Sequence, residues 1–383
     1  MNKSKSHKQL LLEIYKSSLK AVNGRTTVAA YLRKHQIEQP LALISIGKAA
    51  AQMAKGAFDV LNSQISQALL ITKHGHLEDL KSYPILCLEA AHPVPDASSL
   101  AAGQTLLDFI KKLPPTHPIL FLISGGTSAL VEVLNPDITL TDLQRVNNEL
   151  LASGLDIQKM NKIRKSLSAI KGGRLATYLE GHPVLNLLIS DVPNDDLQAI
   201  GSGLLTADEK VCFLNNINIK QEIIAKPAKA RQAACEAAKR LGYEVFEQQE
   251  LIVGEAEIIG QKLGKELCQA KAGIYIASSE TTVHLPENPG QGGRCQSLAL
   301  AAACELEGRT DVFFLAAGTD GTDGPGKFAG AIVDGNTITA SDNDAKEYLK
   351  KADAGSFLAL SGDLIETGPT GTNVMDILIG LKL

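Results

Sequence analysis

The stretch ILFLISGGTSALV, residues 119–131, shows the pattern that sets the fold of this 383-residue chain. Five apolar residues come first, and the polar turn SGGTS follows at 124–128. A short run that is apolar at every position is typical of a strand buried on both faces of a parallel sheet. The stretch therefore predicts a buried strand, then a glycine turn, then a helix.

The same pattern recurs along the chain. Its other copies are LALISIGKAA (41–50), PVLNLLISDVPNDD (183–196), AGIYIASSETT (272–282) and DVFFLAAGTDG (311–321). Helix-forming segments lie between these runs, at residues 50–61, 138–154 and 226–242. Buried strands that alternate with helices predict an α/β fold in which a parallel sheet is covered by helices.

The length of the chain predicts two domains, because one hydrophobic core rarely serves this many residues. Residues 207–250 are richer in charge and lack the strand–glycine pattern, which resumes near residue 272. We therefore expect an N-terminal α/β domain at 1–250 and a smaller α/β domain at 251–383. An amphipathic helix is expected near the N-terminus, where Leu10, Leu11 and Ile14 fall on one helical face.

Composition limits the classes of partner. The chain is 44% hydrophobic and 21% charged, and its net charge of −4 gives no electrostatic reason for a nucleic-acid or anionic-membrane partner. No apolar stretch reaches the ~18 residues of a membrane span, and Glu13 interrupts the apolar run that a signal peptide would need. We therefore expect a cytoplasmic protein that binds neither nucleic acid nor membrane. Its six cysteines lack CxxC or metal-type spacing, so reduced thiols are expected and no metal ligand is identified.

Three turns of the predicted N-terminal domain carry groups suited to an anionic ligand. The SGGTS turn offers backbone N–H groups and hydroxyls where a strand meets a helix. Lys48 follows one buried run directly, and Asp191 follows another. A lysine there suits a phosphoryl oxygen, and an aspartate suits a metal or a substrate hydroxyl. The alternatives are a tight structural turn, a solvated lysine and a helix N-cap.

Three turns of the predicted C-terminal domain are also candidates. Arg294 lies in GQGGRCQS (290–297), where its planar fork suits a carboxylate or phosphate. GPTGTNVMD (368–376) is a glycine–threonine turn, and GTDGTDGPGKFAG (318–330) places Asp320 and Asp323 among five glycines after a buried run. A surface ion pair, a plain loop and a surface turn are the respective alternatives. His92 lies in the extended segment HPVP, which favours a structural role for it.

Two nucleotide-binding fingerprints are missing. The Walker pattern GxxxxGK[ST] does not occur at Gly47–Lys48, where Ala49 follows the lysine. GSGLLT (201–206) lacks the third glycine of GxGxxG. The sequence therefore argues against a P-loop NTPase and against a standard dinucleotide-binding domain.

Taken in order, the motifs resemble those of the type 2 glycerate kinases, the MOFRL family, from about residue 40 to 380. The motifs are GKAA with MAKGA, AHPVPD, SGGTSAL, MNKIRKSLSAIKGGRLA, SDVPNDD with IGSG, GGRCQS, AGTDGTDGP with AGA, and TGPTGTNVMD. The resemblance implies ATP-dependent phosphorylation of D-glycerate, usually at its 2-hydroxyl, with Mg²⁺. It also implies a Rossmann-like N-terminal domain, a smaller C-terminal MOFRL domain and an active site in the cleft between them; a homo-oligomer is left open.

The resemblance also assigns site residues. The catalytic positions are Lys48, Asp191, Arg294 and Asp320. The substrate- or nucleotide-binding positions are Ser124, Gly125, Gly126, Thr127, Ser128, Asn161, Arg164, Gly368, Thr370, Gly371, Thr372 and Asn373. Asp323 would support the GTDG turn or a metal. The chain departs from the family by Cys295 and Ser297 in GGRCQS, where GGRNQE is usual, and by Ser278 and Ser279 in place of a glycine pair.

Three alternative functions stay open at this point. Members of the family have also been labelled hydroxypyruvate reductases, although the missing GxGxxG argues against an oxidoreductase. A kinase acting on a related small sugar acid, or one that makes 3-phosphoglycerate, fits the same motifs. A non-catalytic sugar-acid binding protein is opposed by the retention of all four catalytic positions.

Overall fold

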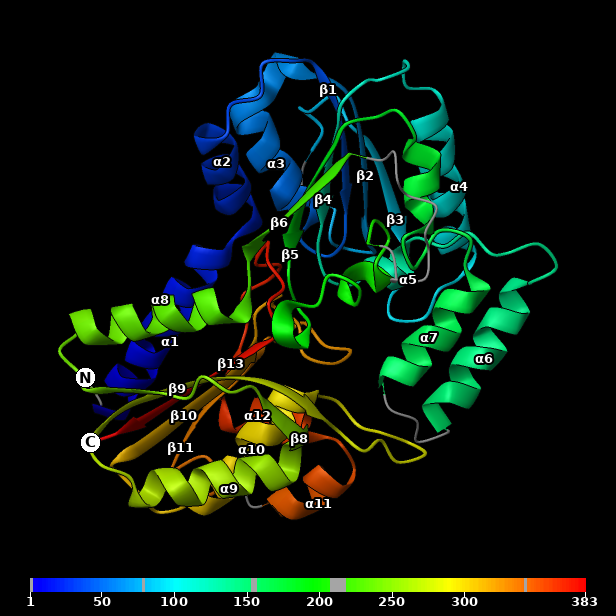
Figure 1. Ribbon diagram of the computed structural model, residues 1–383. Helices are drawn as coiled ribbons and strands as arrows, with labels where there is room; N and C mark the ends of the chain where they lie inside the picture. The colour runs from blue at the N-terminus through cyan, green and yellow to red at the C-terminus, as the bar shows by residue number, and fades with distance from the viewer. Residues whose placement is uncertain (1–2, 78–79, 153–156, 207–217, 341–342) are drawn as a thin grey trace. The chain divides into compact units, whose positions relative to one another are not determined.

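The computed structural model describes residues 3–77, 80–152, 157–206, 218–340 and 343–383 (Figure 1). The chain forms two compact units, which we call the N-terminal unit (residues 23–225 with 371–373) and the C-terminal unit (the chain up to Val22, with 226–370 and 374–383). This division differs from the predicted boundary near residue 250, since the chain leaves the N-terminal unit at residue 225 and its first helix belongs to the C-terminal unit.

The N-terminal unit is built on a six-stranded sheet in which every neighbouring pair is parallel, in the order β3-β2-β1-β4-β5-β6. The strands are β1 Leu41–Ile46, β2 Ile65–Lys73, β3 Leu86–Ala90, β4 Ile119–Ile123, β5 Val184–Ile189 and β6 Ile219–Ala225. All six residues of β1 and all five of β4 are buried, as their continuous apolar runs predict. This is the strand order of a doubly wound sheet, which confirms the predicted α/β/α architecture.

Helices cover both faces of this sheet (Figure 1). They include α2 Gly24–Lys34, α3 Ala50–Leu61, α4 Ala97–Lys111 and α5 Thr127–Leu130, with the 3-10 turns η1 Asn62–Gln64, η2 Arg174–Leu179, η3 Pro193–Asp195 and η4 Ile200–Ser202 in the connections. Helices α6 Leu140–Ala152 and α7 Ile157–Leu167 pack against each other away from the sheet (Figure 1). Helix α3 packs on β1 and β2, and α4 packs on β2 and β3. The core between these layers is aliphatic, with Phe121 fully buried in it.

The C-terminal unit contains a second sheet, in the order β12-β11-β10-β13-β9-β7 with β8 also paired to β9. The strands are β7 Val245–Glu247, β8 Ile252–Glu255, β9 Gly273–Thr282, β10 Val312–Gly318, β11 Gly330–Asp334, β12 Leu364–Ile365 and β13 Asp376–Lys382. Strand β13 is antiparallel to both β9 and β10. The expectation of a parallel sheet is therefore wrong for these apolar runs, which are continuous because helices cover both faces of the sheet whatever its strand direction.

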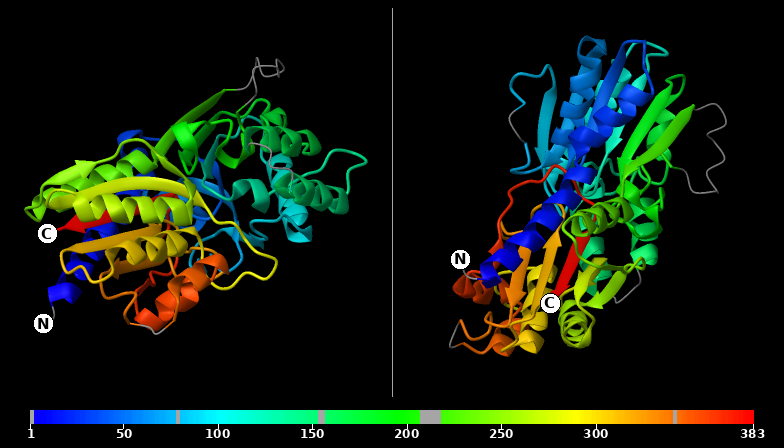
Figure 2. Two further views of the ribbon diagram at one scale, coloured as in Figure 1. Left: turned by 90° about the horizontal axis from the view of Figure 1, so that it is seen from below. Right: turned by 90° about the vertical axis from the view of Figure 1, so that its left-hand side faces the viewer.

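The helices of this unit are α1 Lys3–Val22, α8 Pro227–Arg240, α9 Ala256–Gln269, α10 Arg294–Leu306, α11 Ala345–Lys350 and α12 Ala354–Ser361. Helices α9 and α10 pack together, and α10 covers β10 and β11. Helix α1 packs on α8 and on β10 and β13 (Figure 2). Its buried face includes Leu11, Ile14 and Tyr15, all fully buried, and the Tyr15 hydroxyl donates a hydrogen bond to the Gly318 carbonyl at 2.6 Å. This packing places the N-terminal helix in the C-terminal unit.

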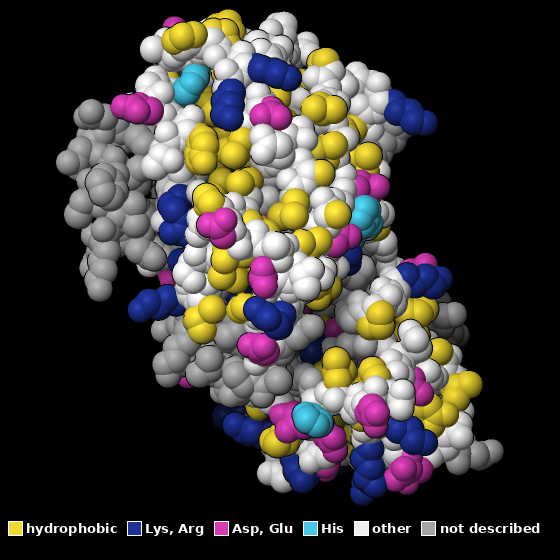
Figure 3. Space-filling model, turned by 90° about the vertical axis from the view of Figure 1, so that its right-hand side faces the viewer, with side chains coloured by type: hydrophobic (Ala, Val, Ile, Leu, Met, Phe, Trp, Pro, Cys, Tyr) yellow, Lys and Arg dark blue, Asp and Glu magenta, His cyan; other side chains and the backbone are white. Residues whose placement is uncertain are grey.

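The outer surface is mixed in character. On the face shown in Figure 3, acidic and basic side chains are interspersed with apolar ones. Among the described residues, no helix has the length and apolar content required to cross a membrane.

Candidate active site

The two strands at the centre of the N-terminal sheet end in glycine turns. Strand β1 is followed by Gly47 and Lys48, and the neighbouring β4 is followed by the SGG turn at 124–126. The chain winds away from β1 toward β2 on one side and away from β4 toward β5 on the other. In doubly wound sheets ligands bind outside the carboxyl ends of the strands at this switch point. The fold thus places Lys48 and the SGG turn where such sheets hold their ligands.

Gly125 is flanked by two polar side chains. A Cβ at this position would overlap Oδ2 of Asp191 and Nδ2 of Asn373. Those two atoms form a hydrogen bond of 2.8 Å, donated by the Asn373 amide. Only glycine fits between them, so the carboxylate lies directly against the backbone of the turn.

Gly126 is flanked by Lys48 and His92. A Cβ on Gly126 would lie 3.2 Å from Cγ of Lys48, 3.1 Å from Cδ2 of His92 and 3.4 Å from its Nε2. Gly126 has φ +86°, which glycine adopts without strain. His92, Lys48 and Gly126 are each partly exposed, so a ligand can reach them. A structural role is expected for His92 from the sequence, but its ring also lies at the glycine turn, where a ligand can reach it.

The hydroxyls of the SGGTS turn mostly serve the turn itself. Ser124 and Thr127 are fully buried. The Ala49 amide donates to the Ser124 hydroxyl at 3.1 Å, and the Thr127 hydroxyl donates to the Ser124 carbonyl at 2.7 Å. Ser128 forms a 2.7 Å hydroxyl–hydroxyl hydrogen bond with Ser202. Helix α5 has only four residues, so its dipole adds little, and the backbone of Gly125 and Gly126 is the part of the turn best suited to a ligand.

The third predicted group of this unit lies on α7. The side chain of Asn161 is outside the described part of the structure. Arg164 is half-buried, and burial lowers its pKa below the ordinary value. Burial lowers the pKa of Lys171, a buried lysine; the ion pair with Glu132 opposes this lowering, and the charge of Arg164 adds to it. Arg164 therefore belongs to a buried charged cluster.

The predicted segment 368–373 is divided between the two units. In the C-terminal unit, Thr370 donates from its hydroxyl to the Thr319 carbonyl, and Gly368 packs its carbonyl against Gly321 of the GTDG loop. In the N-terminal unit, the Gly371 carbonyl accepts a 2.8 Å hydrogen bond from the Gly24 amide. Thr372 is buried, and no hydrogen-bond partner of its hydroxyl is found in the described structure.

The C-terminal unit holds a second polar cluster around Arg294, the first residue of α10. Its guanidinium contacts Asp376 through Nε at 2.7 Å and through Nη2 at 3.1 Å. It also contacts Glu280 through both terminal nitrogens, at 3.3 Å for Nη2. Burial opposes the charge, but Asp376 and Glu280 outweigh it and raise the pKa of Arg294 above its ordinary value. Arg294 thus has carboxylate partners on both sides within the protein.

Sheet register explains this cluster. Strand β13 begins at Asp376, which lies opposite Gly318 at the end of β10 and opposite Ser279 near the end of β9. Because β9 and β10 both run antiparallel to β13, their carboxyl ends share the edge at which β13 begins. Glu280, Asp320 and Asp376 consequently meet at one edge of the sheet. Burial raises the pKa of Asp376, with Arg294 opposing and Asp320 adding to the rise.

The GTDG loop is tied to α10 by its second aspartate. The Asp323 carboxylate accepts hydrogen bonds from the backbone amides of Cys295 at 3.0 Å and Gln296 at 2.8 Å, and so caps α10 from a distant loop. Burial nevertheless raises the pKa of Asp323 to about 6. Asp320 is also buried, and its carboxylate accepts from the Thr322 amide at 2.9 Å. Of the two roles predicted for Asp323, support of the turn or of a metal, these hydrogen bonds fit support of the turn.

Two departures from the family pattern have local explanations. Ser278 accepts a hydrogen bond at 3.3 Å from the buried Arg231, which also pairs with Glu247. Cys295 is fully buried beside Asp376, and burial raises the pKa of its thiol well above the ordinary value. The thiol thus stays protonated and donates toward the Asp376 carboxylate, which keeps a donor at this position.

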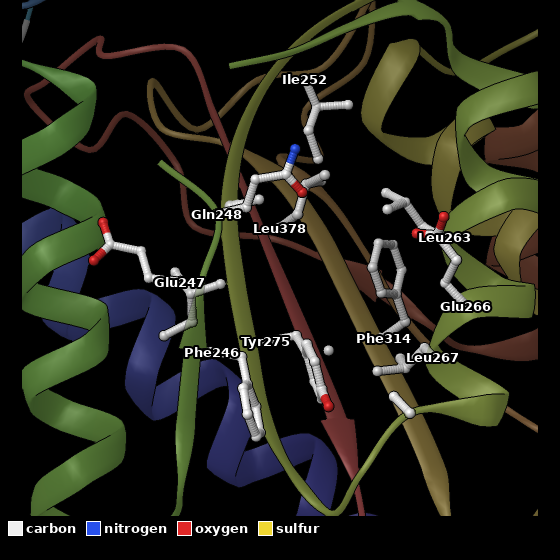
Figure 4. Close-up of a pocket in the computed structure, with 14 residues that line it drawn as sticks. Phe246, Glu247, Gln248, Ile252, Leu263, Glu266, Leu267, Tyr275, Phe314 and Leu378 are labelled. Atoms are coloured by element: carbon white, nitrogen blue, oxygen red, sulfur yellow. The ribbon is translucent and has the colours of Figure 1, made fainter. Parts of the chain in front are cut away.

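A separate cavity of about 250 Å³ lies between α9 and the sheet of the C-terminal unit (Figure 4). Its lining is mainly apolar and includes Phe246, Tyr275 and Phe314. Glu247 points away from it toward α8, whereas Gln248 and Glu266 stand at its margin (Figure 4). No predicted site residue is among the described residues that line it.

Sequence reasoning missed three residues of these clusters: His92, Glu280 and Asp376. His92 stands just past β3, as Lys48 stands past β1, and this shared position could have indicated it. Glu280 and Asp376 lie in quoted motifs, but only the pairing of β9 and β10 with β13 shows that they meet Arg294.

Comparison with known proteins identifies the relatives of the chain. Residues 10–233 match a domain of unknown function, DUF4147, and residues 273–376 match the MOFRL family. A D-glycerate 2-kinase of Thermotoga maritima is 36% identical, with 98% of each chain covered. The crystal structure of a glycerate kinase from Thermotoga maritima superposes with a TM-score of 0.86 at 34% identity, covering 99% of this chain and 100% of that one.

A third relative carries a different name. A protein of Agrobacterium vitis with the provisional name hydroxypyruvate reductase is 32% identical over 88% of this chain and 97% of its own. All these matches span both parts of the chain. The chain therefore belongs to the family in which a DUF4147 domain is followed by a MOFRL domain, the type 2 glycerate kinases.

Proposed function

We propose that the protein transfers the γ-phosphoryl group of ATP to D-glycerate, at its 2-hydroxyl, and releases 2-phosphoglycerate and ADP. The observation that carries this proposal is the full-length likeness to a D-glycerate 2-kinase. The position of Lys48 and the SGG turn at the switch point of a doubly wound sheet supports it, because phosphate groups need a cation and an open backbone there.

The N-terminal unit supplies the groups for the phosphates. Gly125 and Gly126 have no side chain, so phosphoryl oxygens approach their amides closely. Lys48 neutralises charge on the group in transfer, and such stabilisation supplies most of the catalysis in phosphoryl transfer. Asp191, oriented by Asn373, is placed to orient the attacking hydroxyl and accept its proton. Arg164 and Asn161 on α7 are assigned to the same ligands.

The C-terminal unit supplies Arg294 and Asp320. Arg294 recognises the carboxylate of glycerate, and to do so it must exchange one of its present carboxylate partners. Glu280 is the partner to be exchanged, since its side chain is 36% exposed whereas that of Asp376 is 4% exposed. Asp320 lies at the same edge of the sheet, where we assign it metal or proton handling, and Thr370 holds the adjoining loop.

Mg²⁺ is proposed as the metal that accompanies ATP. Within the described ranges no group of three or more His, Cys, Asp or Glu side chains could hold a metal ion. Mg²⁺ in kinases is held by one or two carboxylates together with the substrate phosphates, so the single carboxylate of Asp191 beside Gly125 fits it. When bound, the metal would neutralise charge on the phosphates.

The second candidate function is hydroxypyruvate reduction, after the name of one relative. The N-terminal sheet has the strand order of dinucleotide-binding domains, but its β1–α3 turn reads Gly47, Lys48, Ala49, Ala50. Ala49 and Gln52 stand where GxGxxG has its second and third glycines, which serve the close approach to the pyrophosphate and the helix packing in those domains. This turn favours the kinase.

The test is a coupled assay on the purified protein. ADP release is measured with ATP, Mg²⁺ and D-glycerate, and the product is offered to enolase, which accepts only the 2-phospho isomer. Oxidation of a reduced nicotinamide cofactor with hydroxypyruvate is measured in parallel. ADP release without enolase activity would assign 3-phosphoglycerate, and nicotinamide oxidation without ADP release would replace the kinase by the reductase.

A further inference from the structure

His92 is a polar side chain at the glycine turn that the motifs do not assign. It follows β3, the edge strand of the N-terminal sheet. Asp191 and Asn373 meet Gly125, whereas His92 and Lys48 meet Gly126. The imidazole edge carrying Nε2 is the part that faces this glycine.

Hydrogen bonds hold the segments on both sides of His92. The Ala91 amide donates to the Ser98 hydroxyl at 3.1 Å. Asp96 caps α4 by accepting from the Ser98 amide at 2.8 Å, and the Ser99 hydroxyl accepts from the Asp96 amide at 3.2 Å. On the other side, Gly126 is fixed by amides of α5 that donate to its carbonyl. The partly exposed imidazole thus lies between two segments that hydrogen bonds hold in place.

We propose that His92 is a further catalytic residue of the phosphoryl transfer, in which its Nε2–H donates a hydrogen bond to an oxygen of the phosphoryl group beside Lys48. This inference rests on the proposed kinase function. Its geometric basis is that Nε2 of His92 and the stem of Lys48 contact the same side-chain-free position, so both reach a phosphoryl group lying over Gly126.

The step balances with His92 as a donor only. The bond between the γ-phosphorus and the bridging oxygen of ADP breaks, and its electron pair leaves with ADP. The glycerate oxygen forms the new bond to phosphorus and gives its proton to Asp191. His92 keeps its proton throughout, and its hydrogen bond strengthens as charge grows on the equatorial oxygens.

The test compares three substitutions that differ in where they leave a donor. The amide nitrogen of His92→Gln reaches the place of Nε2, that of His92→Asn reaches only the place of Nδ1, and His92→Ala has no donor. We expect kcat to fall roughly 10²–10³-fold in the Ala and Asn variants. The Gln variant should stay within about tenfold of wild type, and KM for ATP should change less than about threefold in all three.

The control is His117→Ala, a partly exposed histidine just before the amino end of β4 in the same sheet, bonded to Ser66 at 2.8 Å. It should leave kcat unchanged. Equal loss in the Gln, Asn and Ala variants, or a Tm that falls in step with kcat, would make the ring a packing group and overturn the proposal. If wild type releases no ADP with D-glycerate, the kinase function fails and this inference fails with it; wild-type turnover with an unaffected Asn variant rejects only the role of His92.

Discussion

At the scale of single residues, two glycines organise the site of the N-terminal unit. At position 125 only glycine fits against Asp191 and Asn373. At position 126 the missing side chain leaves a space that Lys48 and His92 border. Each glycine therefore matters for what it lacks. A side chain at either position would occupy the volume that the phosphate needs.

The Lys48→Ala variant tests the role of the lysine at this turn. Since the ammonium meets phosphoryl charge mainly in the transition state, we expect kcat to fall on the order of 10²–10³-fold, or about 3–4 kcal/mol. The partly exposed side chain adds little to folding, so Tm should hold. Lys111→Ala, an exposed lysine at the end of α4, is the matched control. A kcat near that of the control would remove Lys48 from the reaction.

Asp323 gives the protein a pH signature of its own. Its pKa is about 6 in the folded protein against an ordinary 3.8, because burial favours the neutral acid. Between about pH 4 and 6 the folded state holds a proton that the unfolded state has released. The contribution of Asp323 to the free energy of unfolding therefore falls as pH rises through this window, by on the order of 1–3 kcal/mol.

Urea unfolding of wild type and Asp323→Asn at several pH values measures this effect. The free energy of unfolding of wild type minus that of Asp323→Asn should fall from pH 4 to pH 6 and stay constant above pH 6. Taking the difference removes the share of other carboxyls such as Asp376, whose pKa is also raised by burial. A difference independent of pH would show that Asp323 is ionised throughout.

At the scale of elements, close contact between α9 and α10 depends on another glycine. A Cβ on Gly260 of α9 would overlap the Leu298 carbonyl and lie 2.8 Å from Cβ of Ala301 on α10. Gly→Ala in an open helix stabilises by up to about 1 kcal/mol. Here we expect Gly260→Ala to lower the free energy of unfolding by about 1–3 kcal/mol, because the helices must separate.

Thermal and urea unfolding of the purified variant measure this cost. Lys262→Ala on the exposed face of the same helix is the control, with 65% of its side chain exposed, and it should leave Tm almost unchanged. A stabilised Gly260→Ala would mean that the two helices can part without loss of packing.

The strands show where sequence reasoning holds and where it stops. Apolar runs predict β1, β4 and β5, since burial on both faces leaves few polar positions in them: Ser45 in β1, Asn186 in β5 and none in β4. The edge strands β3 and β6 were missed, because several of their side chains are half-exposed and the apolar run is broken. The expectation of an all-parallel sheet was wrong for β9 and β10, because the antiparallel strand β13 lies between them and two-sided burial is common to parallel and antiparallel strands.

The candidate site follows the same rule. Lys48, the SGG turn and Asp191 stand next to apolar runs, so local sequence identifies them. Asn373 meets Asp191 across 182 positions of sequence, and Arg294 meets Asp376 across 82. These contacts depend on strand pairing and on the path of the chain, which no local pattern encodes.

At the scale of the whole molecule, removal of the N-terminal helix α1 tests whether this helix belongs to the C-terminal unit. Removal of residues 1–22 should uncover the face of β10 and β13 on which α1 packs. It also deletes the contact of Lys8 with Asp334 at 3.3 Å and the hydrogen bond from Tyr15 to Gly318. We expect amides of β10 and β13 to lose protection from hydrogen exchange while those of β1 and β4 keep it.

Hydrogen exchange followed by mass spectrometry of the shortened and full-length proteins resolves the two sheets. The β1 and β4 peptides serve as the internal reference. Unchanged protection in β10 and β13 would mean that α1 does not stabilise the C-terminal unit. A loss of protection confined to β1 and β4 would mean that α1 belongs to the N-terminal unit instead.

The membership of α1 in the C-terminal unit has a consequence in time. The ribosome makes this helix before the whole of segment 23–225, and α8, on which the helix packs, comes only after that segment. At about 5–20 residues per second this interval lasts roughly 10–40 s. Strand β13, on which α1 also packs, follows all the other described strands of the C-terminal unit in the chain. Segment 23–225 can therefore fold while the C-terminal unit is still being made, whereas the C-terminal unit is completed only once β13 has been synthesised.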